Sequence, residues 1–317
     1  MKIKADYHYL LEQQVQFNQT YNPKHGELTG VYYSSKDDYH IPYNLYIAVS
    51  KPKQTLTLEF SSKILGCNYP KLISKHNIRE CLENINKLGI CRIDIDRILQ
   101  DGCVTSADVT KDVHATLSDE TLQALSVRVK NYRRYKWDYY DGEGIDFIRD
   151  VKSAKCKECI RIYKKEREIR KTKNKHFLST LPNMQEVVNS FDGVTRFEVK
   201  LETINKVRTY LNIQDTYINE VLNAEANPIL TMFDRVFGDA PNVPYIQSAT
   251  YDDFAMQMIL KAYHGDMKTI EMALKQCFAS RSGLSKRMDK IQQTWERMQH
   301  DADGSSCYIN SVRRLLL

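Results

Sequence analysis

The spacing of hydrophobic residues changes near residue 204 of this chain. Before that point, short β-rich runs such as 46–49 and 55–60 alternate with helical segments and turns. Beyond it, apolar residues recur at helical spacing as far as residue 299. The pattern predicts an α+β sheet domain over residues 1–205, followed by a helical region over 206–317.

The predicted elements follow from residue spacing, turn residues and caps. Predicted strands cover 46–49, 55–60, 91–95, 104–113, 145–151, 158–163 and 195–202. Predicted helices cover 72–88, 118–135, 215–223, 228–237, 251–263, 267–278 and 285–299.

Positive charge is concentrated in one segment. The chain carries a formal net charge of +6, which permits a polyanionic partner without requiring one. Residues 149–175, however, contain twelve lysines or arginines and four acids. Because a solvated helical face usually balances both signs, this imbalance favours contact with phosphates. The candidate DNA-binding residues here are Arg161, Lys164, Arg167, Arg170 and Lys171.

A tyrosine lies where a predicted strand meets this basic segment. Tyr163 follows the alternating run 158–162 and precedes Lys164 and Lys165. A tyrosine hydroxyl can attack a phosphodiester when nearby cations stabilise the charge that develops on the phosphate. Most strand-end tyrosines are ordinary sheet residues, so the position alone does not establish a nucleophile.

Acidic residues recur along the predicted strand 104–113 and just after it. Asp108, Thr110, Asp112 and His114 share one face if the strand extends that far. Two carboxylates and an imidazole suit Mg²⁺ or Mn²⁺. The alternative is the solvent-facing side of an antiparallel sheet.

In the predicted strand 195–202, Arg196 and Glu198 alternate with apolar residues. Charges of both signs on one strand face can pair with each other or line an active site, and periodicity does not separate these two arrangements.

Cysteine usage and hydropathy point to a cytoplasmic protein. The cysteines lack the density of a disulfide scaffold, so we expect free thiols. Cys156 and Cys159 have zinc-like spacing, but no second ligand pair follows them. No apolar run reaches the length of a signal peptide or a membrane span.

Taken in order, four segments resemble motifs of filamentous-phage replication endonucleases and of initiators from small rolling-circle plasmids. The four are 58–66 (LEFSSKILG), 104–113 (VTSADVTKDV), 160–165 (IRIYKK) and 195–203 (TRFEVKLET). The resemblance implies a metal-dependent DNA nicking-closing endonuclease on a central antiparallel sheet of the HUH-like type. In these families a strand tyrosine forms a 5′-phosphotyrosine link at the replication origin, and the released 3′-OH primes rolling-circle synthesis.

Carried over residue by residue, the resemblance makes Tyr163 the nucleophile, with Lys165 near the scissile phosphate. It makes Asp108 and Asp112 candidate ligands of Mg²⁺ or Mn²⁺. The stretch 112–114 resembles a His-hydrophobe-His motif with one histidine replaced, which leaves His114 as a further candidate ligand. Glu59 and Glu198 are candidates for metal-linked or structural roles, and Arg196 for pairing with Glu198 or contacting phosphate.

The expected partner is single-stranded or hairpin origin DNA, on whose extruded bases tyrosines 132, 135, 139 and 140 are candidates to stack. For the helical region 206–317, binding of origin duplex, dimerisation and recruitment of a host helicase all stay open. Two alternative functions also stay open. One is a non-catalytic origin-binding or copy-control protein. The other is a relaxase or transposase of the same chemistry, although relaxases usually carry a histidine cluster that this sequence lacks.

Overall fold

The structure of the protein is a computed structural model that describes residues 1–127, 129, 134–140, 142–149, 158–238, 248, 250–300 and 308–317. The chain forms two compact units, each built from two separate stretches. Unit 1 comprises Met1–His114 and Lys164–Pro228, and unit 2 comprises Ala115–Tyr163 and Ile229–Leu317. Among the described helices, none combines the length and apolar character needed to cross a bilayer.

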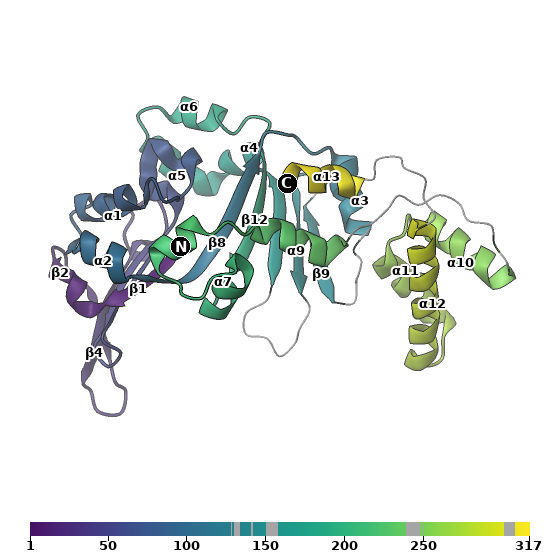
Figure 1. Cartoon of the computed structure of the whole chain (residues 1–317), viewed down its shortest axis with the longest axis horizontal. Coiled ribbons are helices and arrows are strands. Elements are labelled where there is room, and N and C mark those ends of the chain that lie inside the picture. The colour runs from purple at the N-terminus through teal and green to yellow at the C-terminus, as the bar shows by residue number, and fades with distance from the viewer. Residues whose placement is uncertain are drawn as a thin grey trace. The chain divides into compact units, whose positions relative to one another are not determined.

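Unit 1 is organised by an antiparallel sheet (Figure 1). Its strands, in spatial order, are β3 (Asn18–Tyr21), β4 (Leu28–Ser34), β5 (Leu45–Ser50), β6 (Thr55–Phe60), β1 (Lys2–Asp6), β8 (Cys103–Val113) and β12 (Thr195–Leu201). A separate antiparallel pair joins β2 (Leu10–Gln13) to β7 (Cys91–Ile93).

The alternating pattern of β6 explains how this sheet acquires a core face. Leu56, Leu58 and Phe60 are buried, whereas the intervening Thr57 and Glu59 are half-buried. Successive side chains of a strand point to opposite faces, so the leucines and the phenylalanine form one apolar surface. They belong to a core cluster that also contains buried residues of α1 (Ile78–Lys87) and α2 (Ile95–Asp101).

The remaining helical segments of unit 1 are short. They are η1 (Tyr7–Tyr9), η2 (Ser35–Asp37), η3 (Ser62–Lys71), α4 (Lys165–Ile169), α5 (Thr172–Ser179), α6 (Met184–Asn189), α7 (Ile204–Leu211) and α8 (Ile218–Asn223). Helix α4 contacts β12 of the sheet, and η3 contacts the helices α1 and α6. A second apolar cluster, which includes Tyr69, Phe177 and Phe191, fills the space between η3, α5 and α6.

Unit 2 contains a second run of antiparallel strands. These are β9 (Tyr135–Tyr140), β10 (Gly144–Arg149) and β11 (Cys159–Lys164), with β10 in the middle and the last residue of β11 belonging to unit 1. Phe147 on β10 packs edge-on against Phe237 at a ring separation of 5.0 Å. This contact joins the strands to a helix of the same unit.

The helical segments of unit 2 are α3 (Asp119–Val127), α9 (Pro228–Phe237), α10 (Tyr251–Ala262), α11 (Met267–Leu274), η4 (Lys275–Cys277), α12 (Arg281–His300) and α13 (Tyr308–Leu316). Helices α10, α11 and α12 contact one another around a shared apolar cluster that includes Leu260, Ile291 and Trp295. On α9, Asp234 accepts two hydrogen bonds from Arg313 of α13, at 2.7 and 2.9 Å.

The α+β class and the antiparallel strand pairing are confirmed in the described residues, and the chain beyond residue 204 is predominantly helical there, as predicted. The boundaries of the two units differ from the predicted division at residue 205, because each unit is built from two separate stretches of the chain. The predicted helix 118–135 is too long. It ends at Val127, and β9 begins at Tyr135, where Tyr, Trp and Tyr alternate with charged residues. Likewise, the predicted strand 91–95 gives way to α2, because Asp94 caps that helix by accepting from the amide of Arg97.

Candidate functional site

The pairing of β8 with β12 brings the predicted charged residues onto one sheet face. Asp112 lies opposite Arg196, Thr110 opposite Glu198, and Asp108 opposite Lys200. Residues directly opposite each other in an antiparallel pair share a face, and so do alternate residues of one strand. The common face predicted for positions 108, 110 and 112 is therefore present in the sheet.

Arg196 is the most enclosed charge on this face. Its side chain is 4% exposed and donates to both carboxylate oxygens of Asp112, each at 2.6 Å. It also donates to the hydroxyl of Tyr69 at 3.4 Å and lies 4.0 Å from Glu198. A bidentate pair of this kind fixes the geometry of both groups and neutralises the buried guanidinium. Asp112 is thus the partner of Arg196 in this structure.

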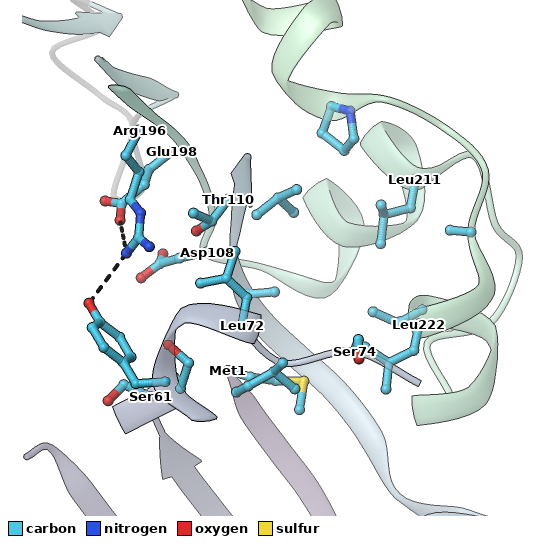
Figure 2. A pocket seen from close by; sticks show the side chains of 18 of the residues that line it. Met1, Ser61, Leu72, Ser74, Asp108, Thr110, Arg196, Glu198, Leu211 and Leu222 are labelled. Atoms are coloured by element: carbon cyan, nitrogen blue, oxygen red, sulfur yellow. Dashed lines mark hydrogen bonds and ion pairs between the residues drawn. The ribbon is translucent and has the colours of Figure 1, made fainter. Parts of the chain in front are cut away.

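A pocket of about 420 Å³ opens over the middle of β8 and β12, entirely within unit 1. Figure 2 shows Asp108, Thr110 and Glu198 on one side of it and Leu211 and Leu222 on the other. Ser61, Ser62, Lys63 and Tyr69 add polar groups to the lining. Pockets that combine apolar walls with a few convergent polar groups are the usual sites for small ligands or for parts of larger ones.

The segment between η3 and α1 supplies the apolar edge of the pocket. The side chain of Asn77 holds this segment by donating to the carbonyl of Leu72 at 2.6 Å and accepting from the amide of Ser74 at 2.7 Å. Leu72 has a φ of 55°, in the region that favours glycine. Backbone strain of this kind persists only where surrounding contacts hold it, and such positions cluster at functional sites.

Three cations pack against the aromatic residues of η3, α5 and the turn before β12. Lys63 lies 5.1 Å from the ring centre of Phe177. Lys165 lies 5.2 Å from the ring of Tyr69, and Arg196 lies 5.5 Å from that of Phe191. We call these six residues the cation–aromatic cluster. Cations over aromatic faces are attracted by the ring quadrupole, most strongly when they are shielded from water.

Glu168 is the carboxylate beside this cluster. It forms an ion pair with Lys165 and a second one, at 2.8 Å, with Lys173. Burial by itself raises the pKa of Glu168, but the charges and hydrogen bonds of Lys165 and Lys173 outweigh it and bring the pKa to about 2. Lys165 is only 2% exposed. A DNA phosphate cannot contact its ammonium in this arrangement without displacing surrounding groups.

Lys63 differs from Lys165 in lining the pocket. Its ammonium donates to Oδ1 of Asn174 at 2.7 Å, and Asn174 in turn donates to the backbone carbonyl and the carboxylate of Glu168. Burial, together with the charges of Lys165 and Lys173, lowers the pKa of Lys63 to about 8, against the opposing effect of Glu168.

The predicted basic segment divides into buried and exposed cations. Lys164 and Lys165 are buried, whereas Arg167, Arg170 and Lys171 are exposed. Arg170 pairs with Asp192 at 2.9 Å. Within the part of the basic segment that belongs to unit 1, the exposed cations of this predicted set therefore begin at Arg167. Predicted contacts from residues 150–157 lie outside the described residues, as does Cys156 of the zinc-like pair.

In unit 2, Tyr163 is half-buried on β11 and lies directly opposite Gly144 of β10. Arg161, two residues earlier on the same face, pairs with Asp146 at 3.1 Å. Tyr140 lies opposite Gly144 on the other side of that glycine. Burial and a hydrogen bond with Asp146 raise the pKa of Tyr140. Among the other tyrosines suggested for base stacking, Tyr135 is buried, Tyr139 accepts from the amide of Gly142, and residue 132 lies outside the described residues.

Of the predicted metal ligands, the structure places Asp108 and Glu198 in one pocket. Asp112 is bound by Arg196, Glu59 pairs with Lys2 at 3.2 Å, and His114 is exposed beyond the end of β8. In the described part of the chain, no group of three or more His, Cys, Asp or Glu residues forms a metal cage. The two carboxylates of Asp108 and Glu198 therefore fit a Mg²⁺ site of one kind. In such a site one or two carboxylates hold the ion, and water or substrate phosphate completes its coordination.

Sequence reasoning assigned no role to Lys63, Tyr69 or Gly144. Lys63 lies inside the first family-like segment, 58–66, which was the one available signal. Tyr69 and Gly144 acquire their roles from contacts with residues distant in the chain, namely Arg196 and Tyr163. The sequence matches no protein-family model and no curated protein.

Proposed function

We propose that this protein is a replication initiator that nicks DNA through Tyr163, forms a 5′-phosphotyrosine intermediate and starts rolling-circle replication. The observation that carries the proposal is the setting of Tyr163. It lies at the end of β11, half-buried beside Arg161, and the chain continues directly into the basic segment with exposed Arg167, Arg170 and Lys171. Attack on a phosphodiester requires a tyrosine hydroxyl that the phosphate can reach and cations that stabilise the charge developing on the phosphate.

In the proposed reaction, the Tyr163 oxygen bonds to phosphorus and the bond from phosphorus to the 3′ oxygen breaks. The tyrosyl proton passes to a base, and the departing 3′ oxygen takes up a proton to become the 3′-OH primer. The linkage conserves the phosphodiester, so a later 3′-OH can reverse the step and close the strand. Exposed cations supply the sequence-independent part of DNA binding.

For the metal, Asp108 and Glu198 are the residues that would hold Mg²⁺ or Mn²⁺. The ion would neutralise charge on phosphate oxygens. Asp108→Ala is expected to raise the metal concentration needed for nicking at least tenfold. Asp96→Ala, an exposed acid on α2 outside the pocket, serves as the control. Equal metal requirements in the two variants would show that Asp108 is not a metal ligand.

The test of nicking is a covalent adduct. The protein is incubated with Mn²⁺ and a random-sequence, single-stranded DNA library labelled at either the 5′ or the 3′ end, and the products are separated on a denaturing gel. A 5′-phosphotyrosine link retains the 3′-labelled fragment on the protein and releases the 5′-labelled one. Mass spectrometry of the protease-digested adduct should then identify Tyr163.

Tyr163→Phe should abolish the adduct while DNA affinity changes by no more than a few-fold, because phosphate contacts from lysine and arginine dominate binding. Tyr139→Phe, on the neighbouring strand β9, is the matched control and should form the adduct normally. An adduct that persists in Tyr163→Phe would refute the assignment. Binding without any adduct in the unaltered protein would instead favour a non-catalytic origin-binding protein.

A further inference from the structure

Three lysines share one carboxylate beside the pocket. Lys165 and Lys173 both pair with Glu168, and Lys63 reaches the same group through the amide of Asn174. These four side chains carry three positive charges and one negative charge, and the carboxylates of Asp108 and Glu198 also line the pocket. Lys63 itself is half-buried, and a lower dielectric around its ammonium strengthens the attraction for an anion.

Of the three lysines, Lys63 is the one whose contact with Glu168 is indirect. Among the described residues, its hydrogen-bond partner is the neutral oxygen of Asn174, and no carboxylate forms an ion pair with it. The ammonium can donate three hydrogen bonds, and the residue lines the pocket. Burial, together with the charges of Lys165 and Lys173, lowers the pKa of Lys63 to about 8. An anion in the pocket would give the Lys63 ammonium a charged hydrogen-bond partner.

We propose that Lys63 binds a phosphodiester group of single-stranded DNA in this pocket. The inference rests on the proposed function in taking DNA as the ligand, and it assigns the phosphate contact to Lys63 instead of the buried Lys165.

The neighbouring residues fit the same ligand. Ser61 and Ser62 precede Lys63 and also line the pocket, and the Ser61 side chain makes no capping hydrogen bond to η3. Two hydroxyl groups beside an ammonium suit phosphate oxygens, which accept several hydrogen bonds at once. The opposite wall, with Leu211 and Leu222, offers an apolar surface for the sugar or base of the same nucleotide (Figure 2).

Lys63→Met tests the proposal, with Lys71→Met as the matched control. Both lysines lie on η3 and both changes remove one charge, but Lys71 is exposed and outside the pocket. Affinity for fluorescently labelled dT20 is measured by anisotropy at pH 7 over a range of salt concentrations. Lys63→Met should weaken binding at least tenfold and lower the salt dependence by about 0.7 in the slope of log K against log salt, the value for one phosphate contact on a single strand. Lys71→Met should stay within twofold of the unaltered protein.

Equal affinities of the two variants would overturn the inference, as would failure of the unaltered protein to bind dT20. Thermal unfolding checks that Lys63→Met is folded. If it is not, acetylation of the unaltered protein at pH 8 decides the question. In that case dT20 should protect Lys63 and leave Lys71 reactive, and equal labelling of Lys63 with and without dT20 would refute the contact. The covalent-adduct assay tests the proposed nicking separately from dT20 binding. A negative outcome in one assay therefore does not affect the interpretation of the other.

Discussion

Gly144 lies directly opposite Tyr163 across the β10–β11 pair, and a Cβ built at position 144 would come within 2.6 Å of the Tyr163 Cβ. It would also lie 2.6 Å from the carbonyl oxygen of Ile162. Real side chains do not approach so closely, so any larger residue must shift the strand that carries Tyr163. The glycine therefore determines where the proposed nucleophile can lie.

We accordingly expect Gly144→Ala to reduce formation of the covalent adduct at least tenfold, because it displaces Tyr163 from β10. Affinity for dT20 should change less than twofold. Gly283→Ala, on α12, is the control, since the nearest atoms to its added Cβ lie at 3.3 and 3.4 Å. Normal adduct formation by Gly144→Ala would show that the close approach does not position the tyrosine for reaction.

Asp112 and Asp108 occupy the same face of β8 but should differ in their effect on stability. Asp112→Ala leaves the buried Arg196 without its bidentate partner, which typically costs about 3–5 kcal/mol in the free energy of unfolding. Asp108 is exposed, and Asp108→Ala should change that free energy by about 0.5 kcal/mol or less. Urea unfolding of both variants measures the difference. Similar losses in the two variants would contradict the structural role assigned to the Arg196–Asp112 pair.

Glu168 should make the fold sensitive to acid. The pKa of this carboxyl is about 2 in the folded protein, against an ordinary value of 4.5. Its stabilising contribution is therefore fully present above pH 4.5 and is lost as the pH falls toward 2. Between those pH values, the melting temperature of the unaltered protein should fall more than that of Glu168→Gln. Glu12→Gln, which removes an exposed carboxylate on β2, should follow the unaltered protein. Parallel melting curves for Glu168→Gln and the unaltered protein would exclude this contribution.

DNA affinity should fall at mildly alkaline pH. The ammonium of Lys63 is charged below its pKa of about 8 and loses its proton above it, with Glu168, Lys165 and Lys173 as the neighbouring charges. Between pH 7 and pH 9.5 the affinity of the unaltered protein for dT20 should therefore decrease, and a bound phosphate should move the midpoint upward. Lys63→Met should show a flatter profile. Identical pH profiles would mean that another group titrates.

Tyr39 and His176 form a candidate platform for bases on the surface of unit 1. Their rings stack at 4.2 Å with an angle of 11°, and Tyr39 is 80% exposed, next to the cations of α5. Stacking on an aromatic ring contributes about 1–3 kcal/mol per base. Tyr39→Ala should thus weaken dT20 binding about fivefold or more, whereas Tyr39→Phe, which keeps the ring, should bind normally. If Tyr39→Ala bound dT20 as tightly as the unaltered protein, Tyr39 would not be part of the DNA-binding surface.

The local features of the fold follow from residue spacing along the chain. The β-rich runs 55–60 and 104–113 predict strands, and the 3.6-residue spacing beyond 204 predicts helices, because backbone geometry sets the period of each kind of element. The sequence also indicated a common face for Asp108, Thr110 and Asp112. The elements β1 and α6 were not predicted from the sequence.

Which charges pair within the protein, and which can meet a ligand, depends on contacts that form when the chain folds. Asp112 and Lys165 look like site residues in the sequence, yet one pairs with Arg196 and the other is enclosed with Glu168 between aromatic rings. Lys63 and Gly144 acquire their significance from Asn174 and Tyr163, which are distant from them in the chain. Burial and pairing depend on contacts between strands and helices that are far apart in the sequence, and no local period encodes such contacts.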